Sequence, residues 1–503
     1  MKNKSQSEKV PVVAGQPRRA VLLSSYGTGA DKGENLGVPG YSHDIVKQLY
    51  APILQKWGEV TFVTQPEENL EAIVSEFRAE GFEPVHLSVI PCQDAYLSPN
   101  CANVLMPAWE FPDIPNEGFA DKPSNDWTVV ARQCDALVVS GPFTSGAFRK
   151  AGVEVPISHV QVPTPQPWFE VSPWSMDQTE SVVCSGYSYS NIDERQPLPL
   201  PILKPVRFRK RKTKLKKYGQ KLEWGIKTAF RSTVSKKFYQ GISDRIRARK
   251  NKYALPEKFD FDELDLSGVV YTSIFNPQDG RKNWQDLISS FLFAVGDRED
   301  ATLVIKLITK QSLFIAKFVK YYLGRRINHK CRVVITSSYL SDEEMVQLAN
   351  ASTYYIQTTR AEGNCLPLMN FLAAGRPGVS PCHSAISDYF DNEVGFVAES
   401  HPEPAAWPHD PELRTRSAWG RLVWPSMVEQ IRESYRIAKE EPQAYQAMAD
   451  RARQRMDSWA SPKNVENRLL AVMEQVFRDR VHGDHSKNSG QSTAKRTSTS
   501  NAA

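Results

Sequence analysis

The sequence has no long hydrophobic run. Its longest clean apolar stretch, Phe291 to Val295 with its neighbours, is far shorter than the roughly 20 residues that a membrane-spanning helix needs. The segment from Met1 to Lys9 is polar, and Pro11 and Pro17 follow it where a secretory signal would have an apolar core. These absences predict a chain that neither crosses a membrane nor carries a secretory signal, and we expect it in the cytoplasm.

The sequence has few cysteines, and it offers little evidence of a metal-binding motif. The seven cysteines show no Cys-x-x-Cys pair, and an odd number does not suggest a disulfide framework. Asp260-Phe261-Asp262 has the spacing of an Asp-x-Asp metal motif, but it stands in an acidic stretch before an expected strand. We therefore predict reduced, structural cysteines and no metal.

Positive charge is concentrated in one segment. Residues 204–252 hold 19 lysines and arginines against two acids, so the rest of the chain is negative although the net charge is +6. From Leu222 to Ile246 an apolar residue recurs every four positions between these cations, which is typical of an amphipathic helix on a membrane surface. An anionic membrane surface is therefore one expected partner. A solvated charged face and a nucleic-acid contact are the alternatives, and no recognition motif supports the nucleic acid.

The length of 503 residues predicts more than one domain, because a single hydrophobic core stops growing near ~250–300 residues. Short apolar runs alternate with helical patterns from Ala20 to Gly141 and again from Gly268 to Thr359. This alternation predicts an α/β fold with two Rossmann-like domains, each built on a parallel sheet with helices on both faces. The expected boundaries are a flexible N-terminus at 1–17, a first domain at 18–175, a variable insertion or linker with the basic amphipathic helix at 176–265, a second domain at 266–455, a closing helix at 456–483 and a disordered tail at 484–503.

The most informative segment runs from Tyr339 to Asp388. Its opening, YLSDEEMVQLANASTYYIQTTRAEGNCLPLMNFLAAGRPGV, places a helix start, a strand and a Glu-Gly-x-x-Leu-Pro motif in succession. Ser341 and Glu344 have the spacing of a capping box, which gives the helix start its own physical reason. The block resembles the donor-binding region of glycosyltransferase family 4, whose members are retaining glycosyltransferases of the GT-B fold.

The resemblance assigns roles within this block. Glu362 matches the acid that contacts the donor sugar, and Asn370 stands where the family has a second acid that binds the ribose hydroxyls. Asparagine can hydrogen-bond a diol but carries no charge, so ribose binding is expected at Asn370 and acid chemistry is not. Further donor contacts are expected from Tyr339, Gly363, Asn364 and Leu366.

The segment from Cys382 to Ile386 matches the place where the family puts backbone and small side chains near the donor phosphates. A helix N-terminus favours an anion there, because its N–H groups are unpaired and its dipole end is positive. His383 in this segment is a candidate donor-binding or acid–base group. The alternative is an exposed loop histidine without a role.

A second motif, SIFNPQDGRKNWQDLISSF at 273–291, matches the basic clamp of the family on the donor diphosphate. Such a clamp stabilises the negative charge that develops as the sugar departs. Lys282 is the expected clamp, and Arg281 either assists it or belongs to a solvated cationic turn. The earlier arginine of the family is not at its expected position, and Asn276 stands nearby.

The first half of the chain carries two further landmarks. In LMPAWEFPDIP at 105–115, Glu110 resembles an active-site carboxylate that faces the sugar from the opposite domain, with a carboxylate on the rim as the alternative. Gly40 lies in a glycine-rich loop where the backbone is expected to approach donor phosphate or acceptor, which the lack of a Cβ permits.

Taken together, the resemblance implies a GT-B enzyme with an N-terminal acceptor domain, a C-terminal nucleotide-sugar domain and a deep interdomain cleft. It implies transfer from a nucleotide-sugar donor to a glycan or lipid-linked acceptor with retention of configuration, catalysed by Glu362, Lys282 and Glu110 without metal or other cofactor. It does not cover 175–265. The missing acid at Asn370 leaves a catalytically silent binding or scaffold protein of the same fold as the alternative.

Overall fold

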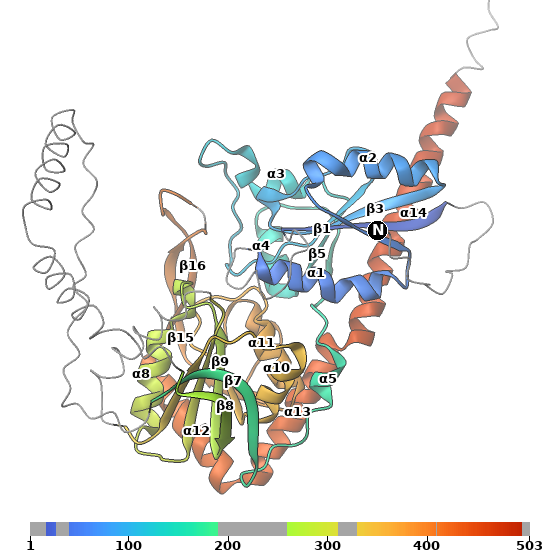
Figure 1. Cartoon of the computed structure of the whole chain (residues 1–503). Helices are drawn as coiled ribbons and strands as arrows, with labels where there is room; N and C mark the ends of the chain where they lie inside the picture. The colour runs from blue at the N-terminus through green and yellow to red at the C-terminus, as the bar shows by residue number, and fades with distance from the viewer. Residues whose placement is uncertain (1–16, 27–39, 190–258, 310–328, 409, 495–503) are drawn as a thin grey trace, which may run out of the picture.

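The computed structural model describes residues 17–26, 40–189, 259–309, 329–408 and 410–494, and it folds them into two α/β units (Figure 1). The basic segment 204–252 lies outside the described residues, and so does most of the predicted flexible N-terminus. Within the described ranges, no helix is long and apolar enough to cross a bilayer.

The first unit is built on a six-stranded sheet whose neighbours are all parallel, in the order β2-β1-β3-β4-β5-β6. Val21 and Leu23 pack on one face with residues of α1, and Leu22 packs on the other face with residues of α2. Strand β1 is therefore buried on both faces, as its continuous apolar sequence predicts. The elements are β1 (Arg18–Ser25), α1 (Tyr41–Leu54), β2 (Glu59–Val63), α2 (Pro66–Ala79), β3 (Phe82–Val89), β4 (Ala102–Leu105), α3 (Trp127–Ala131), β5 (Ala136–Val139), α4 (Pro142–Lys150), β6 (Ile157–His159) and α5 (Gln166–Phe169).

The second unit holds an eight-stranded sheet in the order β14-β13-β12-β9-β10-β11-β7-β8. Strands β10 and β11 extend the parallel part to one side of β9, and β12, β13 and β14 extend it to the other. The direction of winding therefore reverses between β9 and β12, and open α/β sheets bind ligands beyond the carboxyl ends of the strands at such a point. The elements are β9 (Val269–Phe275), α8 (Trp284–Val295), β10 (Ala301–Leu307), β11 (Arg332–Thr336), α10 (Asp342–Asn350), β12 (Tyr354–Ile356), α11 (Leu366–Ala373), β13 (Gly378–Pro381) and β14 (Gly395–Ala398).

The prediction of two α/β domains with parallel sheets is confirmed. The predicted insertion or linker at 176–265 includes two strands at its ends, because β7 (Thr179–Tyr189) and β8 (Phe261–Ser267) pair antiparallel and extend the second sheet. Polar residues hide the alternation of β7, in which Val182 and Cys184 are buried while Val183 is exposed. The Asp-x-Asp triplet enters β8, where Asp262 accepts a hydrogen bond of 2.9 Å from the Ser185 hydroxyl.

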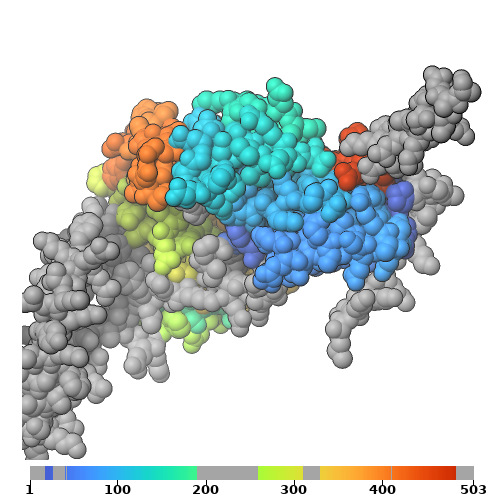
Figure 2. Space-filling model, turned by 90° about the horizontal axis from the view of Figure 1, so that it is seen from above, coloured from blue at the N-terminus to red at the C-terminus, as the bar shows by residue number. Residues whose placement is uncertain are grey.

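A hairpin of β15 (Ser400–Ala406) and β16 (Thr415–Leu422) reaches from the second unit to the first. Trp407, just after β15, is buried in a cluster with Trp109 of the first unit, and its indole N–H donates to the Asp113 carbonyl at 3.0 Å. Figure 2 shows this orange segment lying against the cyan part of the first unit. The sequence analysis did not anticipate this bridge.

Three helices close the chain: α12 (Trp424–Glu440), α13 (Pro442–Ala460) and α14 (Pro462–Ala494). The first two pack on the second unit, whereas α14 rises past the first unit, where Val465, Leu469 and Met473 join the core beneath α1 (Figure 1). The predicted closing helix at 456–483 covers the end of α13 and much of α14, with a break at Ser461 between them. The predicted start of the disordered tail at 484 is wrong, because the backbone remains helical to Ala494.

Candidate active site

A cavity of about 1110 Å³ lies between the two units, at the switch point of the second sheet. The loop after β9 and the loop after β12 both contribute to its wall, together with residues of α1 and of the loop after β4 in the first unit. Its volume is slightly above the ~300–1,000 Å³ of pockets for drug-sized ligands, so there is room for more than one small molecule.

A short turn after β9 presents two cations. The Asp279 carboxylate caps it by accepting the Arg281 N–H at 3.2 Å, and Asn283, with φ of 50°, ends it and begins α8. Arg281 and Lys282 therefore follow one another on a single 3₁₀ turn. Both side chains contact Glu362, which lies 80 residues after Lys282 in the chain.

Glu362 is the buried centre of the charge cluster, with 4% of its surface exposed. Its carboxylate accepts hydrogen bonds from the Lys282 ammonium and, at 3.4 Å, from the Arg281 guanidinium, and its backbone N–H donates to the Ser384 hydroxyl at 2.9 Å. Burial alone would raise the pKa of Glu362, but Lys282 and Arg281 outweigh burial and lower that pKa. The carboxylate is therefore held ionised.

Arg281 connects the two units. Its guanidinium lies 2.9 Å from Asp279, 3.4 Å from Glu362 and 3.5 Å from Glu110, which belongs to the first unit. Burial would lower the pKa of Arg281, but Glu110 and then Glu362 raise it well above the ordinary value. The arginine therefore stays charged.

Glu110 differs from Glu362 in its titration. Its side chain is 18% exposed, and burial raises its pKa, with Arg281 opposing and Glu362 reinforcing the rise. Two carboxylates that face the same arginine thus have pKa values displaced in opposite directions, which is the pattern of sites where two acids serve different roles.

The loop after β12 forms the opposite wall. Cys365, with φ of 58°, turns the chain into α11, so that Leu366 and Asn370 of this helix line the cavity. Gly363 lies against the backbone of Trp109, where an added Cβ would be 3.2 Å from the Trp109 nitrogen. A side chain at this position would press on the backbone of the first unit.

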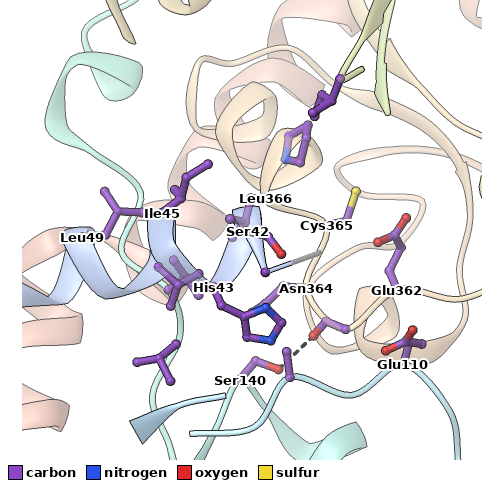
Figure 3. A pocket seen from close by; sticks show the side chains of 18 of the residues that line it. Ser42, His43, Ile45, Leu49, Glu110, Ser140, Glu362, Asn364, Cys365 and Leu366 are labelled. Carbon is purple, nitrogen blue, oxygen red and sulfur yellow. Dashed lines mark hydrogen bonds between the residues drawn. The ribbon is translucent and has the colours of Figure 1, made fainter. Parts of the chain in front are cut away.

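Two polar contacts hold the units together beside the cavity. The Ser140 hydroxyl donates to the Gly363 carbonyl at 3.1 Å, drawn as a dashed line in Figure 3. The Asp388 carboxylate accepts the Phe143 N–H, with both oxygens at 3.2 Å. Burial raises the pKa of Asp388 to about 6, partly offset by the bond from Phe143.

The structure brings most of the predicted site residues together. Ten of them line the one cavity: Gly40, Glu110, Arg281, Lys282, Tyr339, Glu362, Gly363, Asn364, Leu366 and Asn370. Asn276, which stands near the position where the family's earlier arginine was expected, lines it as well. These positions agree with the resemblance, while the role of each residue remains a prediction.

His383 is placed differently. It is not among the residues that line the cavity, and its ring packs over Gly420 of β16, where an added Cβ would lie 2.1 Å from the imidazole. Burial lowers the pKa of His383, partly offset by Glu362. The structure therefore gives His383 a packing contact with the hairpin and no direct access to the cavity.

Two further side chains of the cavity escaped the sequence analysis. Figure 3 shows His43 of α1 among the residues around the cavity, and burial lowers its pKa to about 4. Lys306 on β10 lines the cavity although it is only 3% exposed. Neither belongs to a recognisable motif, because a helix start and an apolar strand surround them.

No group of three or more His, Cys, Asp or Glu side chains in the described residues is arranged to hold a metal ion. The seven cysteines are all free, and burial raises the pKa of several of them, including Cys365 in the cavity wall to about 12. The expectation of a metal-free site stays a prediction.

No protein-family model matches the chain, and no curated protein matches it significantly. Several solved structures are similar at low identity. A glycosyltransferase from Rickettsia africae is 9% identical with a TM-score of 0.49 over 92% of this chain and 99% of its own. Sucrose-phosphate synthase from Thermosynechococcus elongatus is 12% identical with a TM-score of 0.48 over 92% and 99%.

TarM from S. aureus, solved as a mutant with UDP, is 9% identical with a TM-score of 0.42 over 78% of this chain and 55% of its own. The chain thus spans about half the length of TarM. Similarities this low do not establish a function. The mixed α/β fold of two sheet-bearing units around a cleft, which is the arrangement of the GT-B class, is established by the strand order and the cavity themselves.

Proposed function

We propose that this protein is a glycosyltransferase that moves a sugar from a nucleotide-sugar donor to an acceptor in the interdomain cleft. The observation that carries the proposal is the convergence of Glu362, Lys282 and Arg281 from the second unit with Glu110 from the first. This cluster lies beyond the carboxyl ends of β9 and β12, where the topology of an open α/β sheet favours a ligand.

In this proposal the donor binds against the second unit. Lys282 and Arg281 hold the diphosphate, and Glu362 contacts the donor sugar while its charge keeps the two cations in place. Asn370, on α11, binds the ribose hydroxyls with its amide, which needs no charge for that purpose. The supporting observation is that all four side chains line one cavity.

Catalysis would come from positioning and from stabilising the charge that grows on the departing diphosphate. Glu110 faces the reacting sugar from the first unit, and because burial raises its pKa while that of Glu362 is lowered, it is the more readily protonated of the two carboxylates. We propose retention of anomeric configuration because the segment 339–388 resembles retaining enzymes.

We propose a glycan or lipid-linked acceptor. Half-buried apolar side chains line the cavity from both units, namely Ile45 and Leu49 of α1 and Leu366 of α11 (Figure 3). Such a wall suits an acceptor with an apolar portion. We also propose a cytoplasmic enzyme at the inner face of a membrane, held there by the basic segment 204–252.

Release of nucleoside diphosphate tests the proposal. The purified chain is first heated with a panel of UDP-, GDP- and ADP-sugars, because a donor at ~100 times its dissociation constant raises the apparent free energy of unfolding by about 2.7 kcal/mol. The donor that stabilises it is then incubated with acceptor extracts, and NMR of the product reports the anomeric configuration. Donor binding without any turnover would support the catalytically silent alternative, and an inverted product would contradict retention.

A further inference from the structure

Lys306 is a buried cation that opens onto the cavity. It lies on β10 on the same side as Val304, opposite Ile274 of β9 and Thr336 of β11 in the sheet register. Val270, Val304 and Val334 on that face pack with Leu340 and Leu348 of the α10 region. Only 3% of the lysine is exposed, and this residue lines the cavity wall.

Lys306 differs from the two other cations of the cavity in its partners. Its ammonium donates to the Leu307 carbonyl at 3.3 Å, and no carboxylate of the described residues forms an ion pair with it. Arg281 and Lys282 are both ion-paired with Glu362. A buried ammonium without a counter-charge is energetically costly. An anion in the cavity would therefore be stabilised more by Lys306 than by the two cations that are already paired.

The charged residues of the cavity wall are the second reason to single out Lys306. Its described cations are Arg281, Lys282 and Lys306, against the five acids Glu110, Asp279, Asp342, Glu343 and Glu362. A donor diphosphate would add two negative charges to a wall in which acids already outnumber cations. A cation without a carboxylate partner would favour the binding of such a donor.

We propose that the Lys306 ammonium binds an anionic oxygen of the donor diphosphate. The inference rests on the proposed function, and it assigns to the diphosphate a third cation outside the Arg281–Lys282 turn. Burial lowers the pKa of Lys306 to about 8, with Cys184 of β7 opposing slightly, and a bound phosphate would raise it again. The other acids near this face are Asp342, Glu343 and Glu344 at the start of α10, where Glu344 bonds to the Ser341 backbone.

A proton should therefore be taken up when the diphosphate binds. At pH 8 about half of the unliganded Lys306 is neutral, so binding should take up about half a proton. Calorimetric titration with UDP, GDP, ADP and inorganic pyrophosphate, in buffers of different ionisation enthalpy, measures this uptake. The difference between wild type and Lys306→Met isolates the lysine from protons that the ligand itself exchanges.

The Lys306→Met variant should bind the preferred diphosphate about 10- to 100-fold more weakly, the usual effect of losing a hydrogen bond to a charged group. Its uptake of the half proton should vanish. Its melting temperature without ligand should be unchanged or higher, because methionine fills the same space without a buried charge. A variant that binds pyrophosphate and the nucleotides as the wild type does, or takes up the same proton, overturns the proposal.

Two further measurements, the affinity for uridine and the turnover of sugar nucleotides, distinguish this inference from the proposed function. Equal losses of affinity for uridine and for UDP would place Lys306 at the base and overturn the phosphate assignment. Wild type that binds pyrophosphate but turns over no sugar nucleotide would contradict the proposed function, while loss of that binding in Lys306→Met would still support the anion site. Wild type that binds none of these probes would overturn both.

Discussion

Replacing Glu362 by glutamine tests the charge cluster most directly, because it keeps the shape of the side chain and removes the charge. Two unit charges at the 3.4 Å between Arg281 and this carboxylate attract by about 5 kcal/mol at an effective dielectric near 20. The wild-type carboxylate loses much of this to desolvation, and both cations keep some contact with water. We therefore expect the free energy of unfolding to fall by about 3 kcal/mol, as for one broken buried ion pair.

The same substitution should separate binding from turnover. Glutamine releases Lys282 and Arg281 from their carboxylate, so the affinity for nucleoside diphosphate should be unchanged or higher, and this ligand should stabilise the variant more than the wild type. Turnover should fall about 10²- to 10³-fold, because the contact to the sugar carries charge only in the wild type. Thermal unfolding with and without ligand, together with steady-state kinetics, measures both effects.

Asp279→Asn is the matched control. Asp279 also faces Arg281, at 2.9 Å, and asparagine can still cap the turn, but we assign this residue no contact with the sugar. Its turnover should change by less than about tenfold, well below the loss typical of a transition-state contact. Equal losses in the two variants would show that only the charge balance around Arg281 matters, and would refute the role given to Glu362.

Four further expectations concern other parts of the chain. Asn370→Ala should raise the Michaelis constant for the donor with little change in turnover, since a ribose contact holds ground state and transition state alike; a selective loss of turnover would contradict this. Gly420→Ala should lower the free energy of unfolding by about 1–3 kcal/mol through its clash with His383, and adding His383→Ala should relieve most of that loss; equal losses in both backgrounds would rule out the clash. Because burial raises the pKa of Asp388 to about 6, the unfolding free energy of wild type, relative to Asp388→Asn, should fall as pH rises from about 4 to 6 and stay level above about 7, as chemical unfolding can measure. Binding to liposomes should require acidic lipid and fade with salt, and a variant lacking 204–252 that still binds would disprove the membrane role of that segment.

The sequence predicted the two sheets because their parallel strands are continuous apolar runs between helical patterns. Strand β9 is buried along its whole length, as a central parallel strand must be, and its pattern is therefore unmistakable. Strand β7 lies near the edge and alternates with polar residues, so its eleven residues look like a loop. The hairpin β15–β16 escaped notice because its buried residues, such as Trp407, pack against the other unit.

The residues of the candidate site also fall into those that the sequence predicted and those that it did not. Glu362 and Lys282 were found because each lies in a motif that resembles a known family, and motif and fold agree on the cavity. Lys306 was hidden inside TLVIKLI, where periodicity predicts a strand but does not show which face meets a cavity. His43 was missed for a similar reason. A single histidine at the start of a helix belongs to no motif, so the sequence does not show that its side chain faces the cavity.

Helix α14 has a consequence for the order in which this protein can be completed. Val465, Leu469, Met473 and Phe477 belong to the same core as Val21 and Val85, so the first unit is completed by a helix that is synthesised much later than its sheet. At a synthesis rate of roughly 5–20 residues per second, the gap between residues 175 and 477 amounts to about 15–60 s during which that core lacks one wall. A nascent chain must keep the apolar face under α1 from aggregating for that long. A truncation before α14 would thus damage the first unit, although that unit lies about 300 residues earlier in the chain.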